Sequence, residues 1–295
     1  MPATRSSVRE RIDAGARSFS FEFFPPKTPE GENHLWDAIR RLEPLHPTLV
    51  SVTYGAGGTT RDRTVQITRQ IAHTTTLTPM GHLTCVGSTV AELRAVIAEY
   101  ADAGVHHVLA LRGDPPGGPE MPWTSTPGGL EHADDLVELV AQLGDFSVGV
   151  AAFPDVHPNS PSLEFDVAVL KAKQERGADF AMTQMFFEPE PYFRLVEAAT
   201  SAGVEMPIIP GIMPVTNVRQ IERFAQLQGT PLPPAMVAHF EAVTDDPEAV
   251  VELGIEYAAT LCDQLLEGGA PGLHFFTLNR SFSTLRLYRD LGLTV

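Results

Sequence analysis

Short apolar runs alternate with helix-like amphipathic segments along this chain. Eight of these runs end in a cluster of polar or glycine residues: Ser18–Phe24, Thr48–Tyr54, Met80–Val86, His106–Leu111, Ser147–Phe153, Phe180–Phe187, Pro207–Met213 and Leu273–Leu278. Alternating strand and helix signals predict a parallel sheet. Eight such units close into an α/β (βα)8 barrel, a TIM barrel, whose chemistry lies where the strands end.

The intervening segments predict the outer helices, over residues 29–45, 90–103, 132–143, 162–177, 190–202, 217–228, 247–267 and 281–291, with one more beginning at Arg61. An extra helical segment is predicted near Met236–Val243, before the last strand. A length of 295 residues fits one barrel domain over residues 18–295. Residues 1–17 are predicted to be an N-terminal extension with a short helix at one end of the barrel, because they lack the apolar core of a secretory signal.

Composition limits the partners that this chain can have. Its net charge of −16 argues against nucleic acid and anionic membranes, which need a basic surface, but not against a small anionic ligand. No apolar stretch approaches the roughly 20 residues that span a bilayer. Two cysteines without a framework indicate a reducing compartment, so we expect a cytoplasmic protein. We also expect a homo-oligomer, although the sequence shows no interface.

Several common catalytic devices are missing from the sequence. None of the three lysines lies in a strand facing the barrel interior, so a Schiff-base aldolase lacks its nucleophile. No pair of histidines has zinc-ligand spacing, and no metal site is predicted. There is neither a P-loop nor a Rossmann glycine turn, so a redox cofactor would bind by means specific to the barrel.

Glu22 is the strongest catalytic candidate. It alternates with Phe19, Phe21 and Phe23, whose packing under the helices would turn Glu22 toward the barrel interior. We expect burial to raise its pKa, and a carboxyl group that stays protonated near neutral pH is what a general acid requires. The alternative is a glutamate on a solvated strand rim.

Further candidates follow the fourth and sixth strands. Asp114 comes after Arg112 and Gly113; the arginine could pair with a phosphate or an aromatic ring, and the glycine lets backbone approach a ligand. The alternative for Arg112 and Asp114 is a loop ion pair. Gln184, among Met and Phe, is suited to hydrogen-bonding a heterocycle in an apolar cleft.

Two histidines and one helix carry weaker signals. His82 and His157 lie at or just after strand ends, where a histidine is more often functional than elsewhere in a barrel. Asp166 and Lys173 are seven residues apart on one helix face, about 10 Å along its axis. They could line a groove for a polar cofactor, although residues so placed more often form a solvated helix face.

One long irregular stretch interrupts the alternation. Residues 115–129 hold five prolines, four glycines and Trp123. Long loops of this kind at a strand end are either functional, here as a lid, or tolerated surface insertions, and the sequence does not separate the two. A glycine-rich turn, residues 55–58, follows the second strand.

Taken together, the strand-end motifs resemble the methylenetetrahydrofolate reductase family. One motif would be weak, but the set is specific because it occurs in order from Phe19 to the C-terminus. The motifs are residues 20–27 (SFEFFPPK), 50–55 (VSVTYG), 82–85 (HLTC), 111–114 (LRGD), 153–158 (FPDVHP), 183–187 (TQMFF), 210–214 (PGIMP) and 276–280 (FTLNR).

The resemblance implies an FAD-containing barrel of one-carbon metabolism and methionine biosynthesis. NADH or NADPH would reduce the flavin and leave, and methylenetetrahydrofolate would then enter the same site. Glu22 would protonate the folate as its five-membered ring opens, and the reduced flavin would deliver hydride to the methylene carbon. The alternatives are a flavin-free barrel that passes hydride directly from NADH, and an inactive flavin- or folate-binding barrel.

The resemblance also implies roles for individual residues. Asp114 would lie beside flavin and pterin, with Gln184, Phe276 and Arg280 on the substrate side. The positions along the FAD are Thr53, His82, Arg112, Gly113, Asp114, His132, Ala133, Phe153, His157, Asp166 and Lys173. Phe153, Phe276 and His132 stand where the enterobacterial form has tyrosine, Val218 replaces an aromatic residue near the nicotinamide, and the 115–129 loop is longer.

Overall fold

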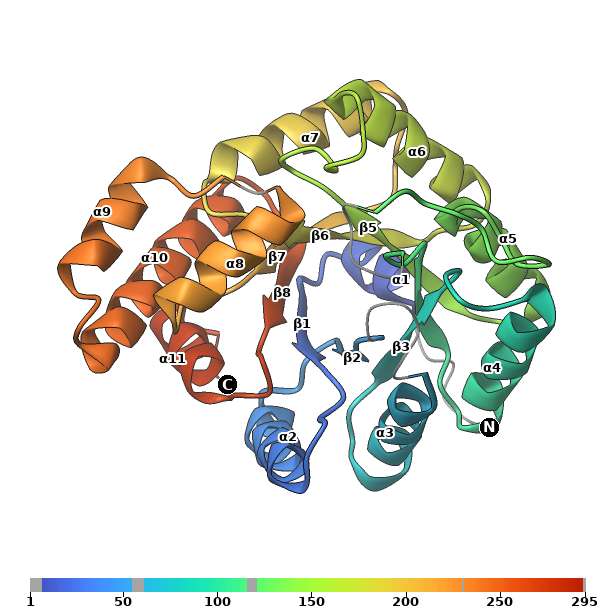
Figure 1. The fold of residues 1–295 in the computed structure, drawn as a ribbon, viewed down its shortest axis with the longest axis horizontal. Coiled ribbons are helices and arrows are strands. Elements are labelled where there is room, and N and C mark those ends of the chain that lie inside the picture. Colours follow the sequence, from blue (N-terminus) through green and yellow to red (C-terminus); the bar gives the residue numbers. More distant parts are fainter. Residues whose placement is uncertain (1–6, 55–60, 116–120, 230, 294–295) are drawn as a thin grey trace.

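The computed structural model describes residues 7–54, 61–115, 121–229 and 231–293 (Figure 1). Eight parallel strands form a closed barrel in chain order, as the sequence predicts. The strands are β1 (Ser18–Phe23), β2 (Leu49–Val52), β3 (Pro79–Thr84), β4 (His107–Leu111), β5 (Ser147–Ala152), β6 (Phe180–Met185), β7 (Ile208–Ile212) and β8 (Gly272–Phe276). The predicted glycine-rich turn at residues 55–58 lies outside the described residues.

Helices follow the strands around the outside of the ring. They are α2 (Pro29–Leu42) with a 3-10 turn η1 (Glu43–Leu45), α3 (Arg61–Thr74), α4 (Val90–Asp102), α5 (Ala133–Leu143), α6 (Leu163–Glu175), α7 (Pro189–Ser201), α8 (Val218–Gln228), α10 (Pro247–Glu267) and α11 (Phe282–Asp290). The predicted extra helix before the last strand is confirmed as α9 (Pro234–Ala242). Side chains cap several of these helices, as where Asp246 accepts from the first amides of α10.

Alternation along β1 sets the direction of its side chains. Phe21 and Phe23 are fully buried in the core between sheet and helices, where Phe21 contacts the rings of Phe275 and Tyr288. Ser20 and Glu22, on the opposite face, point into the barrel. The predicted orientation of Glu22 is therefore confirmed.

The short helix α1 (Val8–Asp13) closes the N-terminal end of the barrel. A capping box between Ser7 and Glu10 starts the helix. Val8 is 1% exposed and packs with apolar residues from the beginnings of five strands: Leu49, Met80, Leu109, Phe180, Met182 and Ile209. This end of the interior is apolar and filled, so it contributes stability.

Most predicted boundaries agree with the structure to within one or two residues, and β8 shows the cause of one such difference. The sequence predicts a strand to Leu278, but β8 ends at Phe276. Leu278 and Asn279 adopt left-handed backbone angles, with φ of 51° and 57°. A strand cannot continue through such residues, so the chain turns there.

Candidate active site

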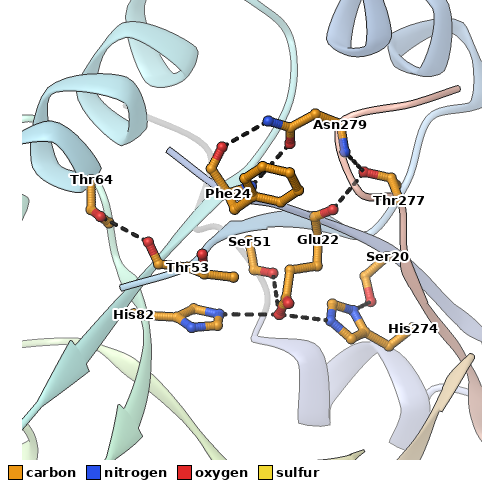
Figure 2. Close-up of polar contacts among 10 residues, drawn as sticks. All are labelled: Ser20, Glu22, Phe24, Ser51, Thr53, Thr64, His82, His274, Thr277 and Asn279. Atoms are coloured by element: carbon orange, nitrogen blue, oxygen red, sulfur yellow. Dashed lines mark hydrogen bonds and ion pairs between the residues drawn. The ribbon is translucent and has the colours of Figure 1, made fainter. Parts of the chain in front are cut away.

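Glu22 occupies the open end of the barrel, among polar side chains from neighbouring strands (Figure 2). The parallel register pairs Glu22 of β1 with Ser51 of β2, and Ser20 of β1 with His274 of β8. His82 approaches from β3. The barrel therefore gathers these side chains from four strands, β1, β2, β3 and β8, that are separated in the sequence.

All contacts of the Glu22 carboxylate fall on one oxygen. Ser51 Oγ donates to Oε2 at 3.4 Å, and His274 Nε2 lies at the same distance. His82 Nε2 is also 3.4 Å away, but without hydrogen-bond geometry. Ser20 Oγ lies 2.8 Å from His274 Nδ1. When Ser20 donates to Nδ1, the proton of His274 is on Nε2 and faces Glu22. Oε1 of Glu22 has no partner among the described residues.

The charge state of Glu22 differs from the sequence expectation. Burial raises its pKa, as we expected. The hydrogen bond from His274, the positive charge that His82 or His274 can carry, and the hydroxyl of Ser51 together outweigh burial and hold the pKa below its usual value. The expectation of a raised pKa was wrong because a sequence shows the burial of a carboxyl group but not the donors that face it.

His82 is buried and neutral at physiological pH. Burial lowers its pKa to about 4, against the opposing attraction of Glu22 and with a further lowering by His274. At neutral pH Glu22 therefore faces a neutral His82 ring and the hydroxyl of Ser51. The hydrogen bonds to the carboxylate come from Ser51 and His274.

The chain after β8 fixes the backbone next to Glu22. Thr277 Oγ1 donates to the Glu22 carbonyl at 2.6 Å. The Asn279 side chain makes two hydrogen bonds to the backbone of Phe24, accepting from its N–H at 3.0 Å and donating to its carbonyl at 2.8 Å (Figure 2). This reciprocal pairing substitutes for strand pairing where β8 has already ended, and it restricts the position of Glu22.

A second group of predicted residues lies at the ends of β4 and β5. Burial, together with the positive charges of Arg112 and Lys173, lowers the pKa of His157, while Asp166 and Asp114 oppose this. Burial and Arg112 also lower the pKa of Lys173 to about 8, against Asp134 and Asp166. Arg112, Lys173 and His157 therefore lie within electrostatic range of one another. Arg112 and Lys173 form a local cationic group in an acidic protein, with the His157 ring beside them.

Asp166 and Lys173 are buried rather than solvated, each 8% exposed. Lys173 Nζ donates to the carbonyl of Ala151 at 3.1 Å. Asp166 accepts from the backbone N–H of His157 at 2.8 Å and from the Ser160 hydroxyl. The alternative of a solvated helix face is therefore wrong for these two residues. The hydrogen bonds of Asp166 hold the loop after β5 in place.

The turn after β4 is tightly packed. Gly113 has φ of 81°, and a Cβ atom there would come within 2.5 Å of the Val86 side chain. Only glycine fits this position without a shift of the Val86 side chain. Asp114 follows on the exposed side of the turn. The alternative of a loop ion pair is absent among the described residues, because neither Arg112 nor Asp114 has a salt-bridge partner there.

The remaining candidates take up varied positions. Gln184 Oε1 accepts from the N–H of Met185 at 2.9 Å, which directs its amide group locally. Phe276 packs edge-on against the His274 ring, with centroids 5.3 Å apart. Arg280 is exposed in the turn after β8. Phe276 therefore contacts a neighbour of Glu22, His274. The contacts described for Gln184 and Arg280 are with residues of their own segments.

The other predicted cofactor positions line the same end of the barrel. Thr53, after β2, donates its N–H to Phe23 and accepts from the Thr64 hydroxyl. His132 and Ala133 begin α5. Phe153 meets the His157 ring edge-on at 4.6 Å. Phe153 therefore adjoins the cationic group.

The residues present fit a flavin dinucleotide in two respects. The positive charges and N–H donors of Arg112 and Lys173 suit a negatively charged diphosphate. Buried polar atoms without a hydrogen-bond partner in the described structure include His82 Nε2, Thr84 Oγ1 and the Tyr54 hydroxyl, all near strand ends. Buried polar groups are normally satisfied, so unpartnered ones at a barrel mouth are consistent with a polar ligand.

Sequence reasoning missed the supporting residues of Glu22: Ser20, Ser51, His274, Thr277 and Asn279. A partial signal was available for two of them. Ser20 shares the inward parity of Glu22, and His274 shares that of Phe276, two residues along its strand. The register between β1 and β8, which joins these pairs, is not visible in the sequence.

The fold and this site define a (βα)8 barrel protein with a hydrogen-bonded carboxylate at its open end. Comparison with known proteins identifies the family: the model of the methylenetetrahydrofolate reductase family matches residues 7–292. The chain belongs to this family of oxidoreductases, which confirms the resemblance seen in the motifs.

Individual relatives agree. The 5,10-methylenetetrahydrofolate reductase of Escherichia coli K12 is 41% identical over 281 residues, covering 94% of this chain and 92% of that protein. Methylenetetrahydrofolate reductase (NADH) 1 of Arabidopsis thaliana is 35% identical, over 97% of this chain and 50% of that protein. A structure of an uncharacterized Clostridium thermocellum protein that binds 5-methyl-5,6,7,8-tetrahydrofolic acid has a TM-score of 0.63 at 14% identity, with 97% of both chains covered, and shows the shared fold.

The described residues contain neither a candidate membrane span nor a candidate metal site. None of their helices is long and apolar enough to cross a bilayer. Their His, Cys, Asp and Glu side chains form no group of three or more that could hold a metal ion.

Proposed function

We propose that this protein reduces 5,10-methylenetetrahydrofolate to 5-methyltetrahydrofolate with NADH or NADPH, through bound FAD, in two half-reactions. Membership of the reductase family supports the reaction. The observation that carries the proposal is the Glu22 carboxylate, which is held through Oε2 at the open end of the barrel and whose Oε1 has no partner among the described residues.

The cationic group is proposed to hold the cofactor. Arg112 and Lys173 would neutralise the diphosphate, and His157 and Phe153 would line the adjoining wall. Bound FAD would supply the redox chemistry, accepting hydride from the nicotinamide and passing it to the folate. The acidic net charge of the protein is no obstacle, because the cations are gathered locally where burial weakens screening.

Glu22 is proposed as the general acid, delivering its proton from Oε1. In the open site its lowered pKa keeps it ionised at neutral pH. The Glu22 side chain is 16% exposed, and a folate covering the open end would remove this remaining water. Desolvation then raises the pKa, so the carboxyl group takes up a proton when the substrate that needs it is present.

The remaining assignments rest on position. Asp114 would orient the folate and disfavour extra negative charge beside it. Gln184 would hydrogen-bond the pterin, and Phe276 and Arg280 would complete the substrate side. Cys85 and Cys262 are both buried as free thiols, which supports a cytoplasmic location.

Steady-state kinetics test the proposal. Initial rates with NADH and methylenetetrahydrofolate as varied substrates should give parallel double-reciprocal lines, because one substrate leaves before the other binds. Intersecting lines with colourless protein would instead indicate direct hydride transfer without flavin. Absence of turnover in protein that binds FAD and folate would indicate an inactive binding barrel.

A further inference from the structure

Trp123 lies in the long irregular stretch after β4, in the part that the structure describes. Its ring covers the Arg112 guanidinium, with the Arg112 Cζ atom 5.0 Å from the ring centroid. A cation this close to a tryptophan face is held by the ring quadrupole. The indole packs on the main core and its Nε1 atom is buried without a hydrogen-bond partner in the described structure.

The segment that carries Trp123 is anchored. Thr126 Oγ1 accepts from the N–H of Gly87 at 3.0 Å, and the Gly128 carbonyl accepts from Val90 at 2.9 Å. Gly87 lies in the connection between β3 and α4, and Val90 is the first residue of α4. The segment after β3 also holds the backbone of Arg112, because the Arg112 carbonyl accepts from the N–H of Val86 at 3.0 Å. Tryptophan and arginine are thus held against each other by two independent sets of backbone contacts.

Stacking and phosphate binding use different parts of an arginine. The ring occupies a face of the guanidinium, while the N–H donors point outward in its plane. Arg112 has no salt-bridge partner among the described residues to occupy those donors. A flexible arginine loses rotamer freedom when it binds an anion, and a stacked one has lost part of it already.

We propose that Trp123 is a positioning residue for the cofactor: it clamps the Arg112 guanidinium so that its donor edge is oriented toward the diphosphate of FAD before FAD binds. This inference rests on the proposed function for the identity of the ligand. It does not depend on the roles of Glu22 or the folate side. It assigns the irregular stretch a part in cofactor affinity.

The test is a double-mutant cycle on FAD affinity, measured as release of fluorescent flavin when the purified holoenzyme is diluted. Trp123→Leu removes the ring and keeps an apolar side chain, and should raise the Kd of FAD about tenfold. Trp123→Phe keeps a ring face and should restore most of the affinity. In an Arg112→Gln background, Trp123→Leu should change the Kd less than twofold, because the clamp has nothing left to position.

Two controls separate this role from general packing. Trp36→Leu replaces the other tryptophan, which is partly buried against the same core from α2, and should leave the Kd of FAD unchanged. With FAD saturating, Trp123→Leu should keep the wild-type kcat, since the clamp affects binding and not chemistry.

Each contrary result has a separate meaning. An unchanged Kd in Trp123→Leu overturns the clamp and leaves only a packing role, as does an equal loss in the wild-type and Arg112→Gln backgrounds. Wild-type protein that holds no FAD at all, and cannot be reconstituted with it, instead overturns the proposed function.

Discussion

Side chains that point inward from the strands fill both ends of the barrel interior, but those at one end are apolar and those at the other are polar. At the closed end, Val8, Leu49 and Phe180 belong to an apolar cluster without a charged side chain. At the open end, two strand positions beyond Leu49, Ser51 contacts the buried carboxylate of Glu22. The comparison indicates that this barrel separates stability from chemistry along its axis. Mutations at the closed end should therefore lower the free energy of unfolding, and mutations at the open end should lower the reaction rate.

Glu22→Gln should have the largest effect. The amide keeps the shape of the side chain but cannot deliver a proton, so reduction of methylenetetrahydrofolate should slow by roughly 10²–10⁴-fold. Flavin reduction by NADH should stay within a fewfold of wild type, because it needs no acid. Rapid-mixing measurement of each half-reaction checks this, and an equal loss in both would refute the acid role.

Leu49→Ala examines the closed end. Leu49 is fully buried, and its truncation should cost about 2–5 kcal/mol of unfolding free energy in urea titrations. The kcat of the folded protein should not change. Ser51→Ala is the matched control on the same strand and face, expected to alter stability by less than about 1 kcal/mol. If Leu49→Ala lowered kcat at full folding, the separation of the two ends would not hold.

His82 should make stability depend on pH. Its pKa of about 4 in the folded protein lies below the value of 6.5 that applies to an unperturbed histidine. The unfolded chain therefore binds the proton more tightly, so stability present above pH 6.5 is lost as the pH falls toward 4, by up to about 3 kcal/mol. The lowered pKa of Glu22 acts only below its own unfolded value of 4.5. The range pH 4.5–6.5 therefore reports the histidines with lowered pKa values, His82 and His157.

His82→Gln should reduce the pH dependence of the unfolding free energy between pH 4.5 and 6.5, measured by urea titration at several pH values, and leave the smaller contribution of His157. His34→Gln changes an exposed histidine on α2 and should leave the wild-type slope. A slope unchanged by His82→Gln would mean that His82 is not buried as a neutral side chain.

Asp114→Asn should have the smallest effect. Asp114 is exposed, so solvent screens its charge and its contribution should be at most about 1 kcal/mol, or roughly fivefold on folate KM or rate. FAD affinity should be retained. Folate kinetics identical to wild type would remove Asp114 from the substrate side.

Features that depend on residues close together in the sequence could be predicted, whereas those that depend on distant residues could not. The strands, the helices and the inward direction of Glu22 depend on local periodicity, and α10 runs from Pro247 to Glu267 as predicted. The charge state of Glu22 depends on His274, 252 residues away, and no local pattern reports that contact. The burial of Asp166 and Lys173 similarly depends on a loop and a strand outside their helix.

The central claim is that the open end of this barrel is a flavin-dependent folate reductase site with Glu22 as its acid. The most direct test is the visible absorption spectrum of purified wild-type and Glu22→Gln protein without oxygen. Both should show a flavin band that NADH bleaches, and methylenetetrahydrofolate should restore the band rapidly only in wild type. Protein that carries no flavin and cannot be reconstituted with FAD, or a band restored equally fast in both proteins, would contradict the account.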